Sequence, residues 1–170
     1  MLPEIKTILY CTTLGPNSAY VFRYAWSIAA RYDAHIVVLH VLESLTTHQR
    51  SFVEGYTGAG SLSEAFEEAT REAAERIPLR VEEFCRREIG KGEWRKVVSR
   101  IIVADGKAAP RILEQIEATH ADLVVVGAAD ESTLMENLIG GTARRIVKRS
   151  PVPVLTVQVP EGRQELTLDI

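Results

Sequence analysis

Residues His35 to Leu42 read HIVVLHVL, an almost unbroken apolar run rich in β-branched side chains. Such a run is typical of a strand that is buried on both faces of a parallel sheet. Comparable runs occupy Ile5 to Cys11, Val97 to Ala104, Asp122 to Gly127 and Pro153 to Val159. Segments with helical spacing separate them, so strands and helices alternate along the chain. This alternation predicts an α/β protein with helices on both faces of a parallel sheet.

The segments between the strands carry apolar residues at helical spacing. The longest runs from Ser61 to Ile89, where apolar side chains recur every three or four residues and mark one face. Pro78 falls inside this pattern, and we expect it to kink or split the helix because proline lacks the required N–H. Shorter helices are expected over Ala19 to Tyr32, in the segment ending near Thr119, and over Thr142 to Ser150.

Composition sets the class of protein before any motif is considered. The chain has 170 residues, of which 46% are hydrophobic and 25% are charged. This is enough for one core, since a domain of this size buries roughly 70% of its unfolded surface. We expect one domain over residues 1–160 and a polar tail over residues 161–170. The formal net charge of −3 argues against a nucleic-acid partner, because such binding is typical of strongly basic domains.

The expected compartment is the cytoplasm. Cys11 and Cys85 form neither a CxxC pair nor a disulfide framework, which is typical of a reducing compartment. The first residues lack the basic segment and apolar run of a signal peptide. The apolar runs fall short of the roughly 20 residues that a membrane helix requires, so we expect no membrane insertion.

The loop that follows Gly127 is the first candidate for a ligand site. Ligands of open α/β sheets lie at the carboxyl ends of the strands, and this loop re-enters a helix at Gly140, Gly141 and Thr142. Glycines at a helix N-terminus let backbone amides approach a ligand, and the helix dipole favours an anion there. In the alternative interpretation the glycines only make a tight turn and the Thr142 hydroxyl only caps the helix.

These same residues resemble a known family. Gly127-Ala-Ala-Asp130, nine further residues, Gly140-Gly141-Thr142 and Pro151-Val-Pro-Val-Leu155 resemble the C-terminal signature of the universal stress protein family. The first, second and fourth strands resemble those of the family, and the likeness covers about residues 3–159. It implies a three-layer α/β sandwich with a five-stranded parallel sheet in the order 3-2-1-4-5. It also implies a cytoplasmic homodimer that regulates stress adaptation through an unidentified protein partner.

In many members of the family an adenine nucleotide lies between the first and fourth strands. The resemblance therefore implies ATP or AMP as a ligand, with Mg²⁺ if the ligand is ATP. The candidate nucleotide contacts that it assigns are Thr12, Thr13, Val41, Gly127, Ala129, Asp130, Gly140, Gly141 and Thr142. No metal-binding spacing of His, Cys, Asp or Glu is apparent, so we expect no site for a metal held by the protein alone.

The chain departs from the nucleotide-binding members at three positions. Those members resemble G-x-x-G, nine residues and G-[ST], whereas this chain has Asp130 at the second glycine and Gly141 at the serine or threonine. Thr13 occupies the position of the family's acidic residue. A carboxylate at Asp130 costs on the order of 1–4 kcal/mol at about 4 Å from a phosphate oxygen, unless a divalent cation bridges the two.

Three functions remain open on these grounds. The first is a regulatory module that binds an adenine nucleotide or a smaller anion, and the second is a family member that has lost ATP binding and serves in dimerisation or protein interaction. The third is a weak ATPase, which the absence of an evident general base disfavours, so no catalytic residue is assigned. His40 is interpreted as a structural histidine, and Cys11 as a buried, unreactive thiol.

The last strand suggests an interface of its own. Val154 to Val159 alternates in character, ends the sheet and would leave an apolar edge exposed. Pairing with the same strand of a second copy across a two-fold axis would remove that edge. We therefore expect a homodimer through Val154 to Val159.

Overall fold

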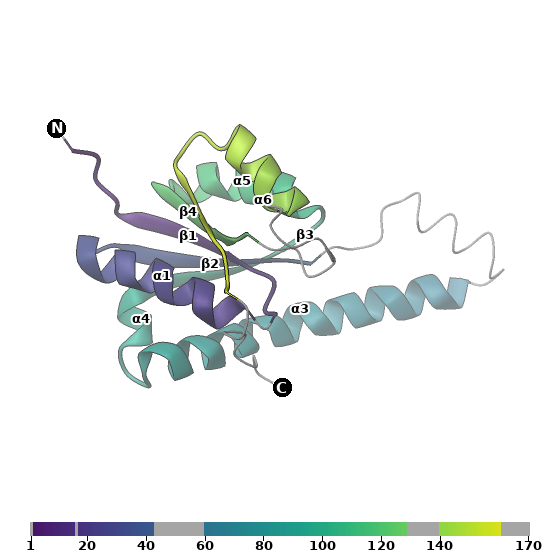
Figure 1. The fold of residues 1–170 in the computed structure, drawn as a ribbon. Helices are drawn as coiled ribbons and strands as arrows, with labels where there is room; N and C mark the ends of the chain where they lie inside the picture. The colour runs from purple at the N-terminus through teal and green to yellow at the C-terminus, as the bar shows by residue number, and fades with distance from the viewer. Residues whose placement is uncertain (1, 16, 43–59, 129–139, 161–170) are drawn as a thin grey trace.

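A computed structural model describes residues 2–15, 17–42, 60–128 and 140–160, with the side chains of 60–67 and 70 excepted. Its five strands are β1 (Thr7–Thr12), β2 (His35–Leu42), β3 (Val98–Asp105), β4 (Leu123–Gly127) and β5 (Val154–Val157). They form one parallel sheet in the order β3-β2-β1-β4-β5 (Figure 1). The expected α/β class and strand order are confirmed.

The helices cover both faces of the sheet, as the near-continuous apolar strands require. Figure 1 shows α1 (Ser18–Tyr32), α3 (Gly60–Ile89) and α4 (Trp94–Val97) below the strands, and α5 (Ala108–Thr119) and α6 (Gly141–Arg149) above them. The molecule is thus a three-layer sandwich. Among the described residues, no helix is both long enough and apolar enough to cross a membrane.

Alternate side chains of each strand enter two separate cores. Ile8 and Tyr10 of β1 point into the core beneath α1 and α3, whereas Leu9 points into the core beneath α5 and α6. The first core is rich in aromatic rings. Phe22 of α1 is fully buried, and its ring centroid lies 5.3 Å from that of Tyr10 and 5.1 Å from that of Phe84 on α3. One ring therefore joins α1 to both the sheet and α3.

The structure differs from expectation in two helices. Helix α3 runs from Gly60 to Ile89 with Pro78 inside it, so the expected split is wrong, while the alternative expectation of a kink stays a prediction. Ile77 and Val81 on either side of the proline are buried against the sheet, and this packing holds the helix where one backbone hydrogen bond is lost. The short helix α4 was not expected.

Two strands are also shorter than the apolar runs suggest. β1 begins at Thr7 rather than Ile5, and β5 covers only Val154–Val157 of the expected Pro153 to Val159. β5 pairs with β4 on one side, so only the residues opposite β4 are held in the ladder. The predicted tail lies outside the described residues, as does the loop expected over Ser44–Gly60 apart from its last residue.

The aromatic contact of Phe22 yields a test of this core. We expect Phe22→Ala to lower the free energy of unfolding by about 3–5 kcal/mol, because a fully buried ring is replaced by a cavity. Urea unfolding of both proteins measures the difference. Tyr32→Ala is the matched control on the same helix, since the Tyr32 side chain is 49% exposed; an equal loss in both variants would contradict the assignment.

Candidate functional site

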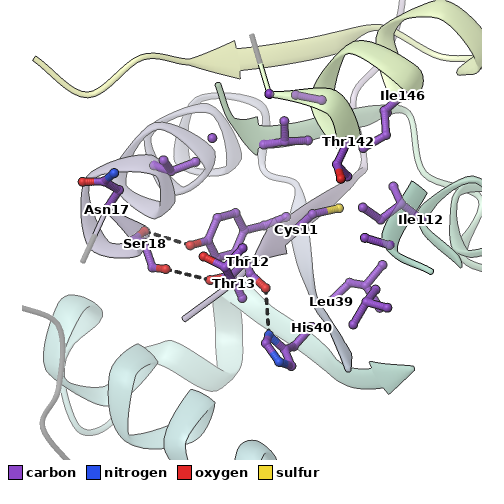
Figure 2. A pocket seen from close by; sticks show the side chains of 18 residues that line it. Cys11, Thr12, Thr13, Asn17, Ser18, Leu39, His40, Ile112, Thr142 and Ile146 are labelled. Atoms are coloured by element: carbon purple, nitrogen blue, oxygen red, sulfur yellow. Dashed lines mark hydrogen bonds between the residues drawn. The ribbon is translucent and has the colours of Figure 1, made fainter. Parts of the chain in front are cut away.

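A cleft of about 330 Å³ opens at the carboxyl ends of β1, β2 and β4, between α1 on one side and α5 and α6 on the other (Figure 2). Its volume is at the lower end of the roughly 300–1,000 Å³ that is usual for small-molecule sites. From β1 the chain builds one half of the sheet through β2 and β3, and then crosses back through α5 to β4 on the other side of β1. The cleft therefore lies at the topological switch point, where open α/β sheets bind their ligands.

Most of the predicted site residues are brought together here. Thr12, Thr13, Val41, Gly127, Gly140 and Thr142 all line the cleft. Gly141 does not: it is the exposed first residue of α6. Ala129 and Asp130 lie outside the described residues. Gly127 and Gly140, which the sequence places at the two ends of one loop, therefore lie beside the carboxyl end of β1.

The hydroxyl of Thr12 is occupied by the protein itself. Its Oγ1 donates to Ser18 Oγ at 2.9 Å and accepts from the backbone N–H of Leu14 at 2.9 Å. The phenol of Tyr10 donates to the Ser18 carbonyl at 2.8 Å. These bonds fix the connection from β1 to α1, in which Leu14 adopts a left-handed conformation with φ of 60°. Thr12 therefore shapes the wall of the cleft, and its side chain is not free for a ligand.

The amino end of α6 supplies the group best suited to an anion. The Gly140 N–H donates to the Ala128 carbonyl at 2.8 Å, which ties the start of the helix to the end of β4. The next amides belong to the first helical turn and have no intrahelical acceptor. The Thr142 side chain lies in the cleft near Cys11 and Ile112 in Figure 2. Helix dipole, amides and hydroxyl together favour a negatively charged oxygen here.

The remaining lining is neutral. Among the described residues that form it there is no Asp, Glu, Lys or Arg. Burial raises the pKa of the Cys11 thiol and of the Tyr10 phenol well above their usual ranges, so both groups keep their protons. This agrees with the interpretation of Cys11 as unreactive. No group of three or more His, Cys, Asp or Glu in the described part of the chain could hold a metal ion.

His40 is hydrogen-bonded as expected of a structural histidine, and it also lines the cleft. Its Nδ1 lies 2.9 Å from the Thr12 carbonyl oxygen, which can only accept, so Nδ1 carries the proton. Burial is the main cause that lowers the pKa of His40 below 6.5, and the charge of Arg80 adds to it against the opposing bond to Thr12. The ring is neutral at pH 7, and Nε2 is left as an acceptor on a side chain that lines the cleft.

Sequence reasoning did not assign several other lining residues. Leu39, Ala108, Ile112 and Ile146 provide an apolar wall, and Asn17 and Ser18 come from the start of α1. In the sequence these aliphatic residues are indistinguishable from core residues, because they recur at the same helical and strand spacing. His40 lies opposite Thr12 at the carboxyl end of the β1–β2 pair, a register that the sequence alone does not give.

The titration of His40 gives a prediction for stability. A lowered pKa in the folded state means that the unfolded chain binds the proton more readily, so unfolding is favoured as pH falls through 6.5. His40→Asn keeps a donor near the Nδ1 position and removes this titration. The difference in unfolding free energy between wild type and variant should shrink as pH falls from about 7.5 to 5. A difference that stays constant in urea titrations over this range would disprove the assignment.

Comparison with known proteins agrees with this geometry. A sequence model of the Universal stress protein family matches residues 4–158. Universal stress protein MJ0531 of Methanocaldococcus jannaschii is 28% identical over 159 residues, which are 92% of this chain and 84% of the relative.

Two solved structures share the fold. Universal stress protein UspA from Lactobacillus plantarum superposes with a TM-score of 0.73 at 16% identity, over 92% of this chain and 99% of the other. A universal stress protein in complex with cAMP superposes with a TM-score of 0.60 at 19% identity, over 91% and 98%. Since the family model extends from before β1 to just beyond β5, the chain belongs to the universal stress protein family.

Proposed function

We propose that this chain is a regulatory binding module whose cleft takes an adenine nucleotide with a single phosphate group, AMP or cAMP. The observation that carries the proposal is a neutral cleft with one anion-binding element, the amino end of α6. In this proposal the protein acts in the cytoplasm in stress adaptation, and a protein partner responds to the bound state. The structural relative in complex with cAMP supports the ligand class.

The amino end of α6, where the phosphate would bind, favours a ligand with one phosphate group over a ligand with three. A helix N-terminus presents the equivalent of roughly half a positive charge together with free amides. A triphosphate would bring further negative charge to a cleft whose described lining contains no Lys or Arg to offset it. The sequence adds Asp130 to the loop that precedes α6, and a carboxylate there disfavours additional phosphates further. ATP with Mg²⁺ is therefore the less favoured ligand.

The other end of the cleft suits a flat apolar ring. Leu39, Val41, Ala108 and Ile112 form a wall of aliphatic side chains drawn from β2 and α5. Such a wall, with few polar groups to fix orientation, is the usual composition of a small-molecule pocket. Thr13 occupies the position where the family places an acidic residue, and its hydroxyl accepts from the Gly15 N–H at 3.4 Å. The base is consequently held more by packing than by charge.

Calorimetric titration at pH 7.5 with AMP, cAMP and ATP plus Mg²⁺ tests this function. We expect AMP or cAMP to bind at least tenfold more tightly than ATP. Thr142→Val should weaken binding by tenfold or more, because a hydrogen bond to a charged group contributes about 1.5–3 kcal/mol. Thr119→Val, at the far end of α5, is the matched control. Absence of binding by every nucleotide would favour the alternative, an interaction module that has lost its ligand.

A gain of affinity can be designed at Gly141. A Cβ at this position would meet no other atom within 4 Å, so a side chain is tolerated. We expect Gly141→Ser to tighten nucleotide binding about threefold to tenfold by adding a hydroxyl at the first residue of α6, between the two lining residues Gly140 and Thr142. Gly141→Ala is the control, because it gives the same relief from glycine in a helix, up to about 1 kcal/mol, without the hydroxyl. Equal affinities of the two variants in the same titration would contradict the phosphate position.

The edge of the sheet supports the homodimer. β5 is the last strand in the order and pairs with β4 alone among the described strands. Its outer hydrogen-bonding groups would pair with those of a second copy across a two-fold axis. Val147 on the neighbouring α6 is 50% exposed and would extend the apolar contact.

The mass of the protein in solution tests the dimer. At micromolar concentration, sedimentation should give twice 18.9 kDa. Thr156→Lys places two like charges near the axis, and we expect it to shift the protein toward the monomer. Ser99→Lys on β3, the opposite edge strand, should leave the mass unchanged. A monomeric wild-type protein, or an equal effect of both variants, would refute pairing through β5.

A further inference from the structure

Helix α6 carries four cationic side chains that face away from the cleft. Arg144, Arg145, Lys148 and Arg149 are all exposed, and none of them lines the cleft. None of them forms an ion pair with a carboxylate in the described part of the chain. Figure 1 shows α6 in the layer above the sheet, on the side opposite α1 and α3. These four residues are called the basic ridge below.

Other helices show how this chain arranges charged side chains on its surface. Arg76 pairs with Glu72 on α3 at 3.6 Å, and Arg111 pairs with Glu114 on α5 at 2.7 Å. Such pairs, three or four residues apart, stabilise a helix. Helix α6 contains no Asp or Glu. The cations of the basic ridge therefore have no carboxylate on their own helix.

The arrangement of the basic ridge opposes the stability of the helix. Arg144 and Lys148 are four residues apart, as are Arg145 and Arg149, and like charges at this spacing repel one another. Arg144 also lies close to the amino end of α6, where the helix dipole disfavours a cation. The dipole favours only the two cations of the last turn. Folding alone does not account for the ridge, whereas a bound anion would relieve its repulsion.

The size and composition of the basic ridge select the kind of anion. With a rise of 1.5 Å per residue, the distance from Arg144 to Arg149 along the helix axis is only about 8 Å. Three of the four side chains are arginines, whose planar guanidinium groups bind carboxylates through two parallel hydrogen bonds. The chain as a whole has a formal net charge of −3, so its remaining surface would repel an extended polyanion such as a nucleic acid or an anionic membrane. A short acidic segment contacts the ridge alone.

We propose that the basic ridge is the docking surface for an acidic segment of a partner protein, in which several Asp or Glu side chains are closely spaced. The inference rests on the proposed function and deepens it, because it gives the chemistry of the partner of the regulatory module. Thr142 of the same helix lines the cleft where the phosphate would bind. Ligand and partner would therefore contact different sides of one short helix.

Fluorescence anisotropy with labelled hexaglutamate measures the docking, and labelled hexaglutamine is the uncharged control peptide. The titrations are made without nucleotide, at ionic strengths of about 0.03 and 0.3 M. We expect hexaglutamate to bind at the lower ionic strength. Its affinity should fall at least tenfold at the higher one, because salt screens contacts between exposed charges. Hexaglutamine should not bind at either.

Two double variants separate the basic ridge from the net charge of the protein. Arg144→Glu combined with Arg145→Glu should weaken hexaglutamate binding tenfold or more, because it replaces attraction by repulsion. Arg71→Glu combined with Arg76→Glu is the matched control, since both arginines are exposed on α3 and the net charge changes by the same amount. This control should keep the wild-type affinity within about twofold.

Arg145→Glu alone gives a readout that requires no partner. It converts the like-charge pair with Arg149 into a Glu–Arg pair in the favourable order along the helix. We expect the Tm of this variant to lie about 2 °C above that of the wild type, while hexaglutamate binds less tightly. A lower Tm would show that the fold itself uses Arg145 and would contradict the inference.

Further results would overturn the inference, and each is distinguishable from a failure of nucleotide binding. Hexaglutamate could bind no better than hexaglutamine, or the two double variants could lose affinity equally. A changed mass of the Arg144→Glu, Arg145→Glu protein in sedimentation would assign the ridge to a contact between copies. Tighter binding of a single-stranded oligonucleotide or of anionic vesicles would assign it to those polyanions. If hexaglutamate docks as expected and no nucleotide binds in calorimetry, the docking surface stands and the proposed ligand fails.

Discussion

β1 is hydrogen-bonded along both sides, to β2 and to β4, and the arrangement of the rest of the molecule depends on this strand. A parallel strand in the middle of a sheet cannot pair with the next stretch of chain through a tight turn, so each connection must cross a face of the sheet as a helix. Those helices bury both faces and direct the connecting loops to the ends of the strands. The position of the cleft is a consequence of this geometry before any site residue is considered.

The hydrogen bonds at the carboxyl end of β1 then fix the shape of one wall of the cleft. Thr12 uses its hydroxyl for the Ser18 side chain and its carbonyl for His40, and Tyr10 holds the Ser18 carbonyl. The chain therefore leaves the sheet along a fixed path into α1. Because these groups satisfy one another, the polar atoms that stay open to a ligand come from elsewhere. They include the first turn of α6, the Thr142 hydroxyl, the imidazole of His40 and Asn17 Oδ1, which is buried without a partner among the described residues.

Much of this was predictable from the amino-acid sequence, and the exceptions have physical causes. Runs such as HIVVLHVL identify buried strands because both of their faces are apolar, and the strand order followed from the resemblance to a family. The expected split of α3 at Pro78 was wrong because local propensity ignores the buried residues on either side. The expected start of the third strand at Val97 was wrong because a β-branched residue at the boundary fits a strand as well as the last turn of α4.

The site was predictable at Gly127, Gly140 and Thr142, where the spacing of the glycines in the sequence marks the loop and the start of the helix. It was not predictable at His40, whose ring is held by a carbonyl 28 residues away in the sequence.

The division of the interior into two cores has a consequence for the two cysteines. Cys11 packs against the core beneath α5 and α6, whereas Cys85 of α3 is fully buried in the opposite core. The sheet stands between them, and a disulfide requires Cα atoms within about 7 Å. Burial raises the pKa of Cys85 to about 12, so its thiolate is scarce at neutral pH. A disulfide between Cys11 and Cys85 of one chain therefore cannot form while the sheet is intact.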